Sequence, residues 1–264
     1  MPYSKADPTE SEAVLFPDLP RAQILSAYAA SPGDELASGK FASPASSAAL
    51  VANTFGFFLN DPELLPALPG MAEAGWPAQR IELEACARFP WSGGQHPWLD
   101  VLISTRTHLI AIESKRFEPF RPGKSSQLSE AYWRPLWGPA MDGYQAVRDG
   151  LADGKLAYKH LDAHQLIKHA LGVRAEAGRR GLQPILAYLY AQTLSWPDES
   201  EISDKMLARH RDEVADFAGR VSADEVSFVA LTYGRLLSSL CESWEARVRD
   251  HAVRLGQHYE PGET

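Results

Sequence analysis

Cysteine is scarce in this chain of 264 residues, in which only Cys86 and Cys241 occur. Two cysteines can build neither a disulfide framework nor a four-cysteine zinc site. Long apolar runs are also missing, because no stretch approaches the roughly eighteen residues that a membrane span needs. The first residues, MPYSKADPTESEAV, lack the basic start and the apolar stretch of a secretory signal. We therefore expect a cytoplasmic protein with reduced thiols and no membrane contact.

An excess of positive charge is absent as well. The 26 Lys and Arg residues face 34 Asp and Glu residues, which gives a formal net charge of −8. This balance disfavours a protein that coats nucleic acid with its whole surface. Hydrophobic residues make up 45% of the chain and charged residues 23%, which excludes the collagen-like, coiled-coil and wholly disordered classes.

The distribution of proline and of apolar residues divides the chain into three segments. Residues 1–44 are polar and broken by six prolines, which predicts a partly ordered N-terminal arm with one helix near 21–30. Residues 45–255 carry the strong hydrophobic patterns and predict a single domain. Residues 256–264, GQHYEPGET, predict a polar tail.

Hydrophobic periodicity predicts an α/β domain whose mixed sheet is flanked by helices on both faces. Ser46 or Ser47 begins the first helix of this domain, and Asp162 and Gly178 mark the start and end of a later one. Short hairpins come first and helical crossovers later, so the sheet cannot be purely parallel. The expected helices cover 46–59, 141–151, 162–177, 200–219 and 235–255, and the expected strands cover 79–87, 98–105, 108–115, 184–192 and 226–233.

The segment WLDVLISTRTHLIAIESKRFE, at residues 98–118, holds the most informative pattern. Its two apolar strands have a very short connection and predict an antiparallel hairpin. If the turn centres on Arg106-Thr107, the numbers of opposed residues sum to 213, so Asp100 and Glu113 become cross-strand partners. Directly opposed residues have Cβ atoms about 4.5–5.5 Å apart, and like charges there destabilise a sheet.

Two carboxylates this close, at the end of apolar strands, need a compensating cation. Lys115 shares a sheet face with Glu113 and serves in part. Mg²⁺ serves better, with Mn²⁺ as its substitute, because it binds carboxylates together with phosphate. A carboxylate pair, a metal and a lysine are the parts needed to hydrolyse a phosphodiester, since the metal activates water and the lysine orients the nucleophile or stabilises the transition state.

The segments LDVLI and IAIESK resemble the D-(x)n-[D/E]-x-K signature of the PD-(D/E)XK nuclease superfamily, and the similarity is nearest to uncharacterised bacterial members. The resemblance covers about residues 45–235 and rests on Asp100, Glu113 and Lys115. It implies the restriction endonuclease-like fold, with an αβββαβ core, and a Mg²⁺-dependent deoxyribonuclease, expected to be an endonuclease. Asp100 and Glu113 then ligate the metal, while Lys115 acts on the attacking water. Leu99 stands where the strict signature has proline, a position at which many members vary.

The resemblance also implies auxiliary residues. The carbonyl of Ser114 joins the metal ligands. Many members have a further acid upstream, which makes Glu84 an added ligand or part of a second metal site; a solvent-facing glutamate is the equally weighted alternative. Some members place a glutamine on the helix after the E-x-K strand, a role that fits Gln165, with ordinary helix-surface polarity as its alternative. His164 and His169 are interpreted as surface or packing residues, because an acidic site prefers oxygen ligands.

DNA is the expected substrate, and cutting both of its strands predicts a homodimer, a protein partner or two sequential cuts. Trp133 and Trp137 are interpreted as hydrophobic plugs under a loop rather than as stacking platforms for bases. Because only a few basic residues are available to contact phosphates, the affinity for DNA should depend only weakly on salt concentration. The alternative interpretation is that these residues belong to two solvated loops. These residues are Lys115, Arg116, Arg121 and Lys124 in one segment, and Lys168, Arg174, Arg179 and Arg180 in another.

Two other hypotheses accompany the nuclease. The first is a catalytically inactive nuclease-fold protein that binds nucleic acid or serves as a scaffold. The second is a structural protein with a fortuitous E-x-K, in which Glu113 and Lys115 lie on a solvated edge. The apolar residues around both acids argue against this second alternative.

Overall fold

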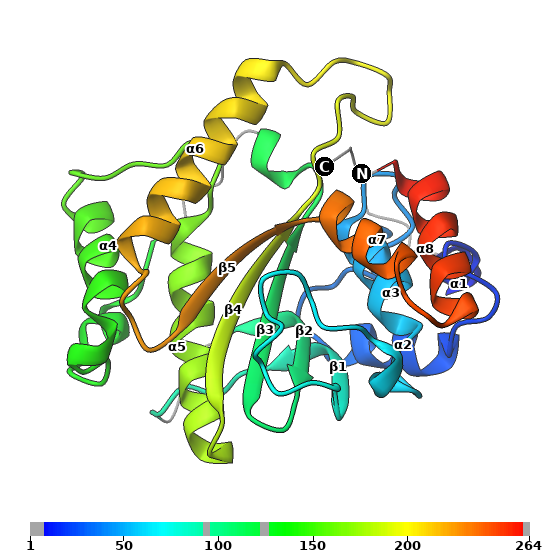
Figure 1. Cartoon of the computed structure of the whole chain (residues 1–264). Helices are drawn as coiled ribbons and strands as arrows, with labels where there is room; N and C mark the ends of the chain where they lie inside the picture. The colour runs from blue at the N-terminus through cyan, green and yellow to red at the C-terminus, as the bar shows by residue number, and fades with distance from the viewer. Residues whose placement is uncertain (1–7, 92–95, 122–126, 261–264) are drawn as a thin grey trace.

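A mixed five-stranded sheet separates two layers of helices in the computed structural model, which describes residues 8–91, 96–121 and 127–260 (Figure 1). The spatial order of the strands follows the chain, with antiparallel pairing of β1 with β2 and of β2 with β3. The last three strands are parallel. The expected α/β class with a mixed, helix-flanked sheet is therefore confirmed. The strands are β1 (Arg80–Cys86), β2 (Trp98–Ser104), β3 (His108–Lys115), β4 (Gln183–Tyr190) and β5 (Ser227–Thr232).

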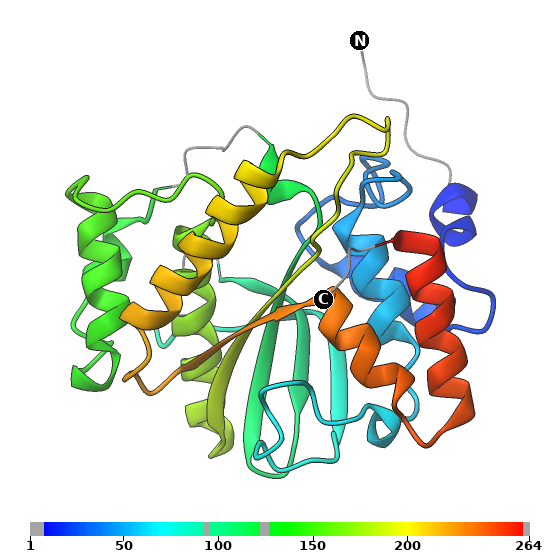
Figure 2. The same cartoon turned by 45° about the horizontal axis from the view of Figure 1, so that its top comes forward.

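The helices divide between the two faces of the sheet, as both views show (Figures 1 and 2). No helix in the described part of the chain is long and apolar enough to cross a membrane. One face carries α1 (Pro8–Ala13), α2 (Arg21–Ala30), α3 (Ser47–Gly56), α7 (Tyr233–Cys241) and α8 (Ala246–Tyr259). The other carries α4 (Asp142–Ala152), α5 (Ala163–Arg180) and α6 (Asp204–Arg220). Short 3₁₀ turns lie at Pro62–Leu64, Glu118–Phe120, Glu130–Trp133 and Pro139–Met141.

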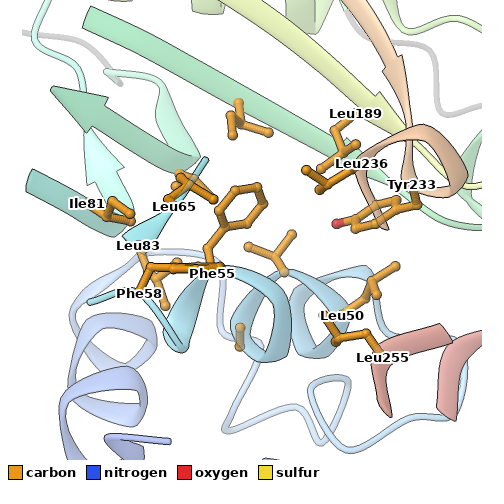
Figure 3. Packing of buried hydrophobic residues seen from close by; sticks show 14 of the residues in the cluster. Leu50, Phe55, Phe58, Leu65, Ile81, Leu83, Leu189, Tyr233, Leu236 and Leu255 are labelled. Carbon is orange, nitrogen blue, oxygen red and sulfur yellow. The ribbon is translucent and has the colours of Figure 1, made fainter. Parts of the chain in front are cut away.

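Each face of the sheet has its own hydrophobic core, because neighbouring strand residues point to opposite sides. On β3, Ile110 and Ile112 pack into the core under α3, α7 and α8, while Leu109 and Ala111 pack into the core under α4, α5 and α6. Figure 3 shows the first core, where Phe55 of α3 lies among side chains from the sheet and from α7. Full burial of such a side chain stabilises the fold by about 1.5–3 kcal/mol.

The N-terminal segment contributes to the first core. Ile24 and Tyr28 of α2 are almost fully buried there. Asn53 of α3 accepts a hydrogen bond from the backbone N–H of Phe16 at 2.8 Å and donates to the carbonyl oxygen of Val14 at 3.0 Å. Residues 8–44 are thus packed on α3 over part of their length. The division of the chain at residues 44 and 255 stays a prediction.

Side-chain caps begin two helices where the sequence predicts them. The Ser46 side chain accepts a hydrogen bond from the N–H of Ala49, and that of Asp162 accepts one from the N–H of Gln165. The predicted end of the second helix is wrong. α5 continues through Gly178 and ends at Arg180, because the next residue, Gly181, has a left-handed backbone with a φ of 66°. A glycine within a helix costs only about 1 kcal/mol, and the ion pairs of Arg179 and Arg180 with Glu176 stabilise this last turn.

The expected helix over 235–255 is two helices. α7 ends at Cys241, and α8 begins at Ala246 and continues to Tyr259. The turn between them lets each helix bury its own apolar face, whereas one straight helix of that length would run past the sheet. Tyr259 is only 5% exposed and receives a hydrogen bond from Asn53 at 2.6 Å, so helical packing extends beyond Leu255.

Candidate active site

The β2–β3 hairpin has the register that the sequence predicts. Val101 pairs with Ile112, and the numbers of every pair down to Ser104 and Leu109 sum to 213. A hydrogen bond of 2.9 Å from the N–H of Thr105 to the carbonyl oxygen of His108 closes the two-residue turn. Continued by one step, this register places Asp100 beside Glu113, where the ladder between the two strands ends.

Asp100 occupies the end of that ladder. Its Oδ2 accepts a hydrogen bond from the backbone N–H of Ser114 at 2.6 Å, which holds the carboxylate against the end of β3. Burial raises the pKa of Asp100 well above its usual value, and the negative charges of Glu113 and Glu84 raise it further against the opposing effect of Lys115. The carboxyl group therefore stands in surplus negative charge, which a cation would relieve.

Glu113 is 1% exposed and faces α5. Its Oε1 forms an ion pair with Nζ of Lys115, and its Oε2 lies 3.0 Å from Nδ1 of His169. Burial by itself would raise the pKa of Glu113, but the Lys115 and His169 charges outweigh it and hold the pKa at about 2. Glu113 is thus ionised at neutral pH. A solvated edge is wrong for this residue, because water does not reach it.

Lys115 connects β3 to α5. Its Nζ donates a hydrogen bond to Oε1 of Gln165 at 2.9 Å, and its side chain is 15% exposed. Burial would lower the pKa of Lys115, yet the charges of Glu113 and Asp100 raise it above the usual value. The amine therefore remains a cation that points into the acidic group.

Helix α5 supplies one contact to each residue of the E-x-K pair, from Gln165 to Lys115 and from His169 to Glu113. Gln165 and His169 are one turn apart on this helix, so they share a face. Gln165 lies where the sequence predicts it, beside Lys115, although its role stays a prediction. His169 is 3% exposed and touches Glu113, so of the two interpretations left open, a surface or a packing residue, packing is the one that holds. Its position four residues after Gln165 was the signal that sequence reasoning missed.

Glu84 interrupts β1 opposite Asp100. The pairs on either side, Leu83 with Val101 and Ala85 with Leu99, keep one register. Glu84 itself has a φ of 49°, a conformation that costs a non-glycine residue roughly 1–3 kcal/mol. As a result Leu83 packs into the first core and Ala85 into the second, although residues two apart normally share a face.

The Glu84 carboxyl group belongs to the same electrostatic group as Asp100 and Glu113. Burial raises its pKa to about 7, repulsion from Glu113 adds to the rise, and a hydrogen bond with Ser31 at the end of α2 opposes it. The three acids lie side by side across the sheet, with Glu84 of β1 opposite Asp100 of β2 and Asp100 opposite Glu113 of β3. Whether Glu84 ligates a metal stays a prediction.

These donors suit a hard divalent cation. Both carboxylate oxygens of Glu113 are buried without a hydrogen bond of good geometry, and burial together with the nearby negative charges raises the pKa of Asp100. Among the described residues, no three Asp, Glu, His or Cys side chains gather into a preformed metal cluster. An ion held by Asp100 and Glu113 would therefore complete its shell with backbone, water and phosphate oxygens, as Mg²⁺ usually does.

Several of the basic residues expected to bind phosphate are engaged within the protein. Arg116 is 8% exposed and donates to the carbonyl oxygens of Pro44 at 2.6 Å and Tyr259 at 3.0 Å, so it holds two distant segments together. Lys124 lies outside the described residues. Arg174 forms an ion pair with Glu225, and both Arg179 and Arg180 form ion pairs with Glu176.

A cleft of about 1620 Å³ opens where the chain leaves β3 and β4, next to residues of α7 and α8. Arg116 and Phe117, just after β3, and Thr193, just after β4, line it, whereas the carboxylates of Asp100 and Glu113 do not. Trp196 also lines the cleft and stacks on Phe117, with ring centroids 5.3 Å apart. In both views the chain between β4 and α6, coloured yellow, arches over this end of the sheet (Figures 1 and 2).

Trp196 is an aromatic residue that the sequence pattern did not single out. Trp137 is 1% exposed and is the hydrophobic plug that the sequence predicts. Trp133 is 43% exposed and donates from Nε1 to Asp149 at 3.0 Å, so the same interpretation is wrong for it.

Comparison with known proteins agrees with this architecture. No curated protein and no solved structure matches the chain. A family model described as "Restriction Endonuclease associating with ARP" matches residues 8–260, which include the whole sheet, all the acids described above and α5. The chain therefore belongs to this family of restriction endonuclease-like proteins.

Proposed function

We propose that the chain is a Mg²⁺-dependent deoxyribonuclease of the PD-(D/E)XK kind that cuts within DNA. The observation that carries the proposal is the position of Lys115, whose amine touches the buried Glu113 and Gln165 beside the partly buried carboxyl of Asp100. A hydrated surface strand does not bury a glutamate such as Glu113 between a lysine and a second acid, because isolated buried charges are costly. Membership of a restriction endonuclease family supports the same chemistry.

Each residue has a distinct task in this proposal. Asp100 and Glu113, with the carbonyl of Ser114, hold the metal, which when bound lowers the pKa of a coordinated water and offsets charge on the phosphate. Lys115 orients the attacking water and stabilises the charge that develops on the phosphoryl oxygens. Gln165 holds the amine of Lys115 in place through the 2.9 Å hydrogen bond.

The substrate path follows from the cleft beside the site. Phe117 and Thr193 extend from the same ends of β3 and β4 that carry the site, so a strand cut at Lys115 would continue into the cleft. Trp196 supplies a flat surface there for a base. We further infer that a protein partner helps to place the substrate, because the family is described by its association with ARP.

A cleavage assay on supercoiled plasmid with Mg²⁺ or Mn²⁺ tests the proposal. Asp100→Asn, Glu113→Gln and Lys115→Ala should each lower the rate by at least about 100-fold, the usual effect of losing a metal ligand or charge-stabilising group. Glu82→Gln is the matched control, since Glu82 lies on β1 but pairs with Arg80 at the surface. Equal cleavage by the wild type and all three site variants would refute the nuclease.

A second function is favoured by one observation. Lys115 and His169 already contact the two carboxylate oxygens of Glu113, which suits a nuclease-fold protein that binds nucleic acid without turnover. Calorimetry separates the two functions. Binding of Mn²⁺ to the wild type, lost in Glu113→Gln, supports the enzyme, whereas DNA binding without any Mn²⁺ binding supports the inactive protein.

A further inference from the structure

A buried histidine completes the contacts of the candidate metal ligand Glu113. His169 lies in the middle of α5 and is 3% exposed. Its Nδ1 is 3.0 Å from Oε2 of Glu113, on the side of the carboxylate opposite to the Lys115 contact at Oε1. The two oxygens of one carboxylate are therefore each held by a different cationic or proton-donating side chain.

The four-residue spacing on α5 lets the helix contact Lys115 and Glu113 at the same time. Gln165 accepts the hydrogen bond from Lys115, and His169, four residues later, meets Glu113. Because residues four apart lie on one helix face, α5 reaches both members of the E-x-K pair at once. The helix is fixed on the sheet by buried side chains that flank His169, such as Leu166 and Val173.

We propose that His169 is a positioning residue that fixes the Glu113 carboxylate for metal binding through its Nδ1–H; this inference rests on the proposed nuclease. Nδ1 of His169 and Oε2 of Glu113 are close enough for a hydrogen bond, but the angle between the ring and the carboxylate is unfavourable. Neither Nδ1 nor either Glu113 oxygen therefore has a hydrogen bond of good geometry. Catalytic hydrogen bonds are often loose before the ligands bind and tighten afterwards. Partners of this type orient metal ligands, and losing one costs 10–100-fold in metal affinity in known sites.

Substitutions of His169 can separate positioning from packing. Asn places an amide N–H near the position of Nδ1, Gln places it near the position of Nε2, and Leu supplies no donor. We expect His169→Asn to bind Mn²⁺ within about threefold of the wild type, and His169→Leu and His169→Gln to bind at least about tenfold more weakly by calorimetry. His164→Asn, on the same helix but partly exposed, is the control and should bind as the wild type does.

A second readout needs no metal. The nitrogen resonances of the His169 imidazole in the metal-free protein should show a proton on Nδ1, and these resonances should move in Glu113→Gln. Resonances that report an unprotonated Nδ1, or that do not respond to Glu113→Gln, would overturn the inference, as would Mn²⁺ binding that is unchanged in His169→Leu or equally weak in Asn and Leu variants.

Failure of the parent proposal has a different signature. A wild-type protein that binds no Mn²⁺ overturns both the metal-dependent nuclease and the positioning role. Mn²⁺ binding and cleavage that persist in His169→Leu overturn the positioning role alone. Circular dichroism and thermal melting of every variant identify any loss of binding that comes from unfolding.

Discussion

Nζ of Lys115, at the last position of β3, donates a 2.9 Å hydrogen bond to Oε1 of Gln165 in the first turns of α5. This bond ties the lysine of the E-x-K motif to a helix on the far side of a long loop. Because Lys115 also pairs with Glu113, its amine is held at two points. Two fixed points leave the third N–H of the ammonium group free to meet a substrate oxygen.

Loss of the Gln165 contact should slow cleavage without abolishing it. Gln165→Ala removes one of the two points that hold Lys115, so we expect the rate to fall about tenfold, less than in Lys115→Ala, because the charge itself remains. Steady-state cleavage of plasmid DNA measures this effect. His164→Ala, at a partly exposed position on the same helix, is the control. A Gln165→Ala rate equal to that of the control would contradict the holding role.

The pKa of Glu84 predicts an unusual pH dependence of stability in the metal-free protein. Its folded-state pKa of about 7 exceeds the ordinary 4.5, so between these values the folded protein binds more protons than the unfolded chain. Stability therefore falls as the pH rises through this window. Glu84→Gln has no carboxyl group to ionise, so it does not lose this stability as the pH rises. The variant should be more stable than the wild type at pH 8, by at most ~3 kcal/mol.

Urea unfolding in the presence of a chelator, at several pH values from about 5 to 8, measures this difference. At the acidic end, where Glu84 is protonated, the variant and the wild type should have similar free energies of unfolding. Two curves that stay parallel over the whole range would show that Glu84 is not a buried, protonatable group.

Asn53 should be one of the costliest polar residues to remove. Its side chain bonds Phe16, Val14 and Tyr259, and so joins the N-terminal segment to α3 and α8. Asn53→Ala leaves buried partners unpaired, and we expect a loss of about 2–4 kcal/mol in the free energy of unfolding. Asn60→Ala, at an exposed position, should change it by less than about 0.5 kcal/mol. An equal effect of both substitutions in urea would contradict the network.

Trp196 tests the substrate path. If a DNA strand lies in the cleft, Trp196→Ala should raise KM by about tenfold and leave kcat nearly unchanged, since a stacked base contributes roughly 1–3 kcal/mol to binding and nothing to the chemistry. Trp244, which is 85% exposed and does not line the cleft, supplies the control. A fall in kcat without a change in KM, or the same effect at both tryptophans, would place the substrate elsewhere.

The sequence predicted those parts of the molecule that local patterns determine. The short turn at Arg106-Thr107 and the apolar strands around it set the β2–β3 register, and the structure has it. The caps at Ser46 and Asp162 were readable for the same reason, because a helix start depends on a few adjacent residues. The family match to residues 8–260 supports the nuclease-like class that the motif implied.

Features set by tertiary packing were not predictable. The break between α7 and α8 contains neither glycine nor proline and exists because two short helices cover the core better than one. Glu84 has a left-handed backbone at the position opposite Asp100, a conformation that strand propensity does not encode. The contacts of His169 and Arg116 could not be predicted, since their partners Glu113, Pro44 and Tyr259 are remote in sequence.

The central claim is a metal site formed by Asp100 and Glu113, and a crystal soaked in Mn²⁺ tests it most directly. An anomalous difference map should show a manganese peak between the two carboxylates, bound to oxygen ligands at about 2.0–2.3 Å, the range for hard divalent cations of this size. A map from a fully soaked crystal with no peak between Asp100 and Glu113 would contradict the account.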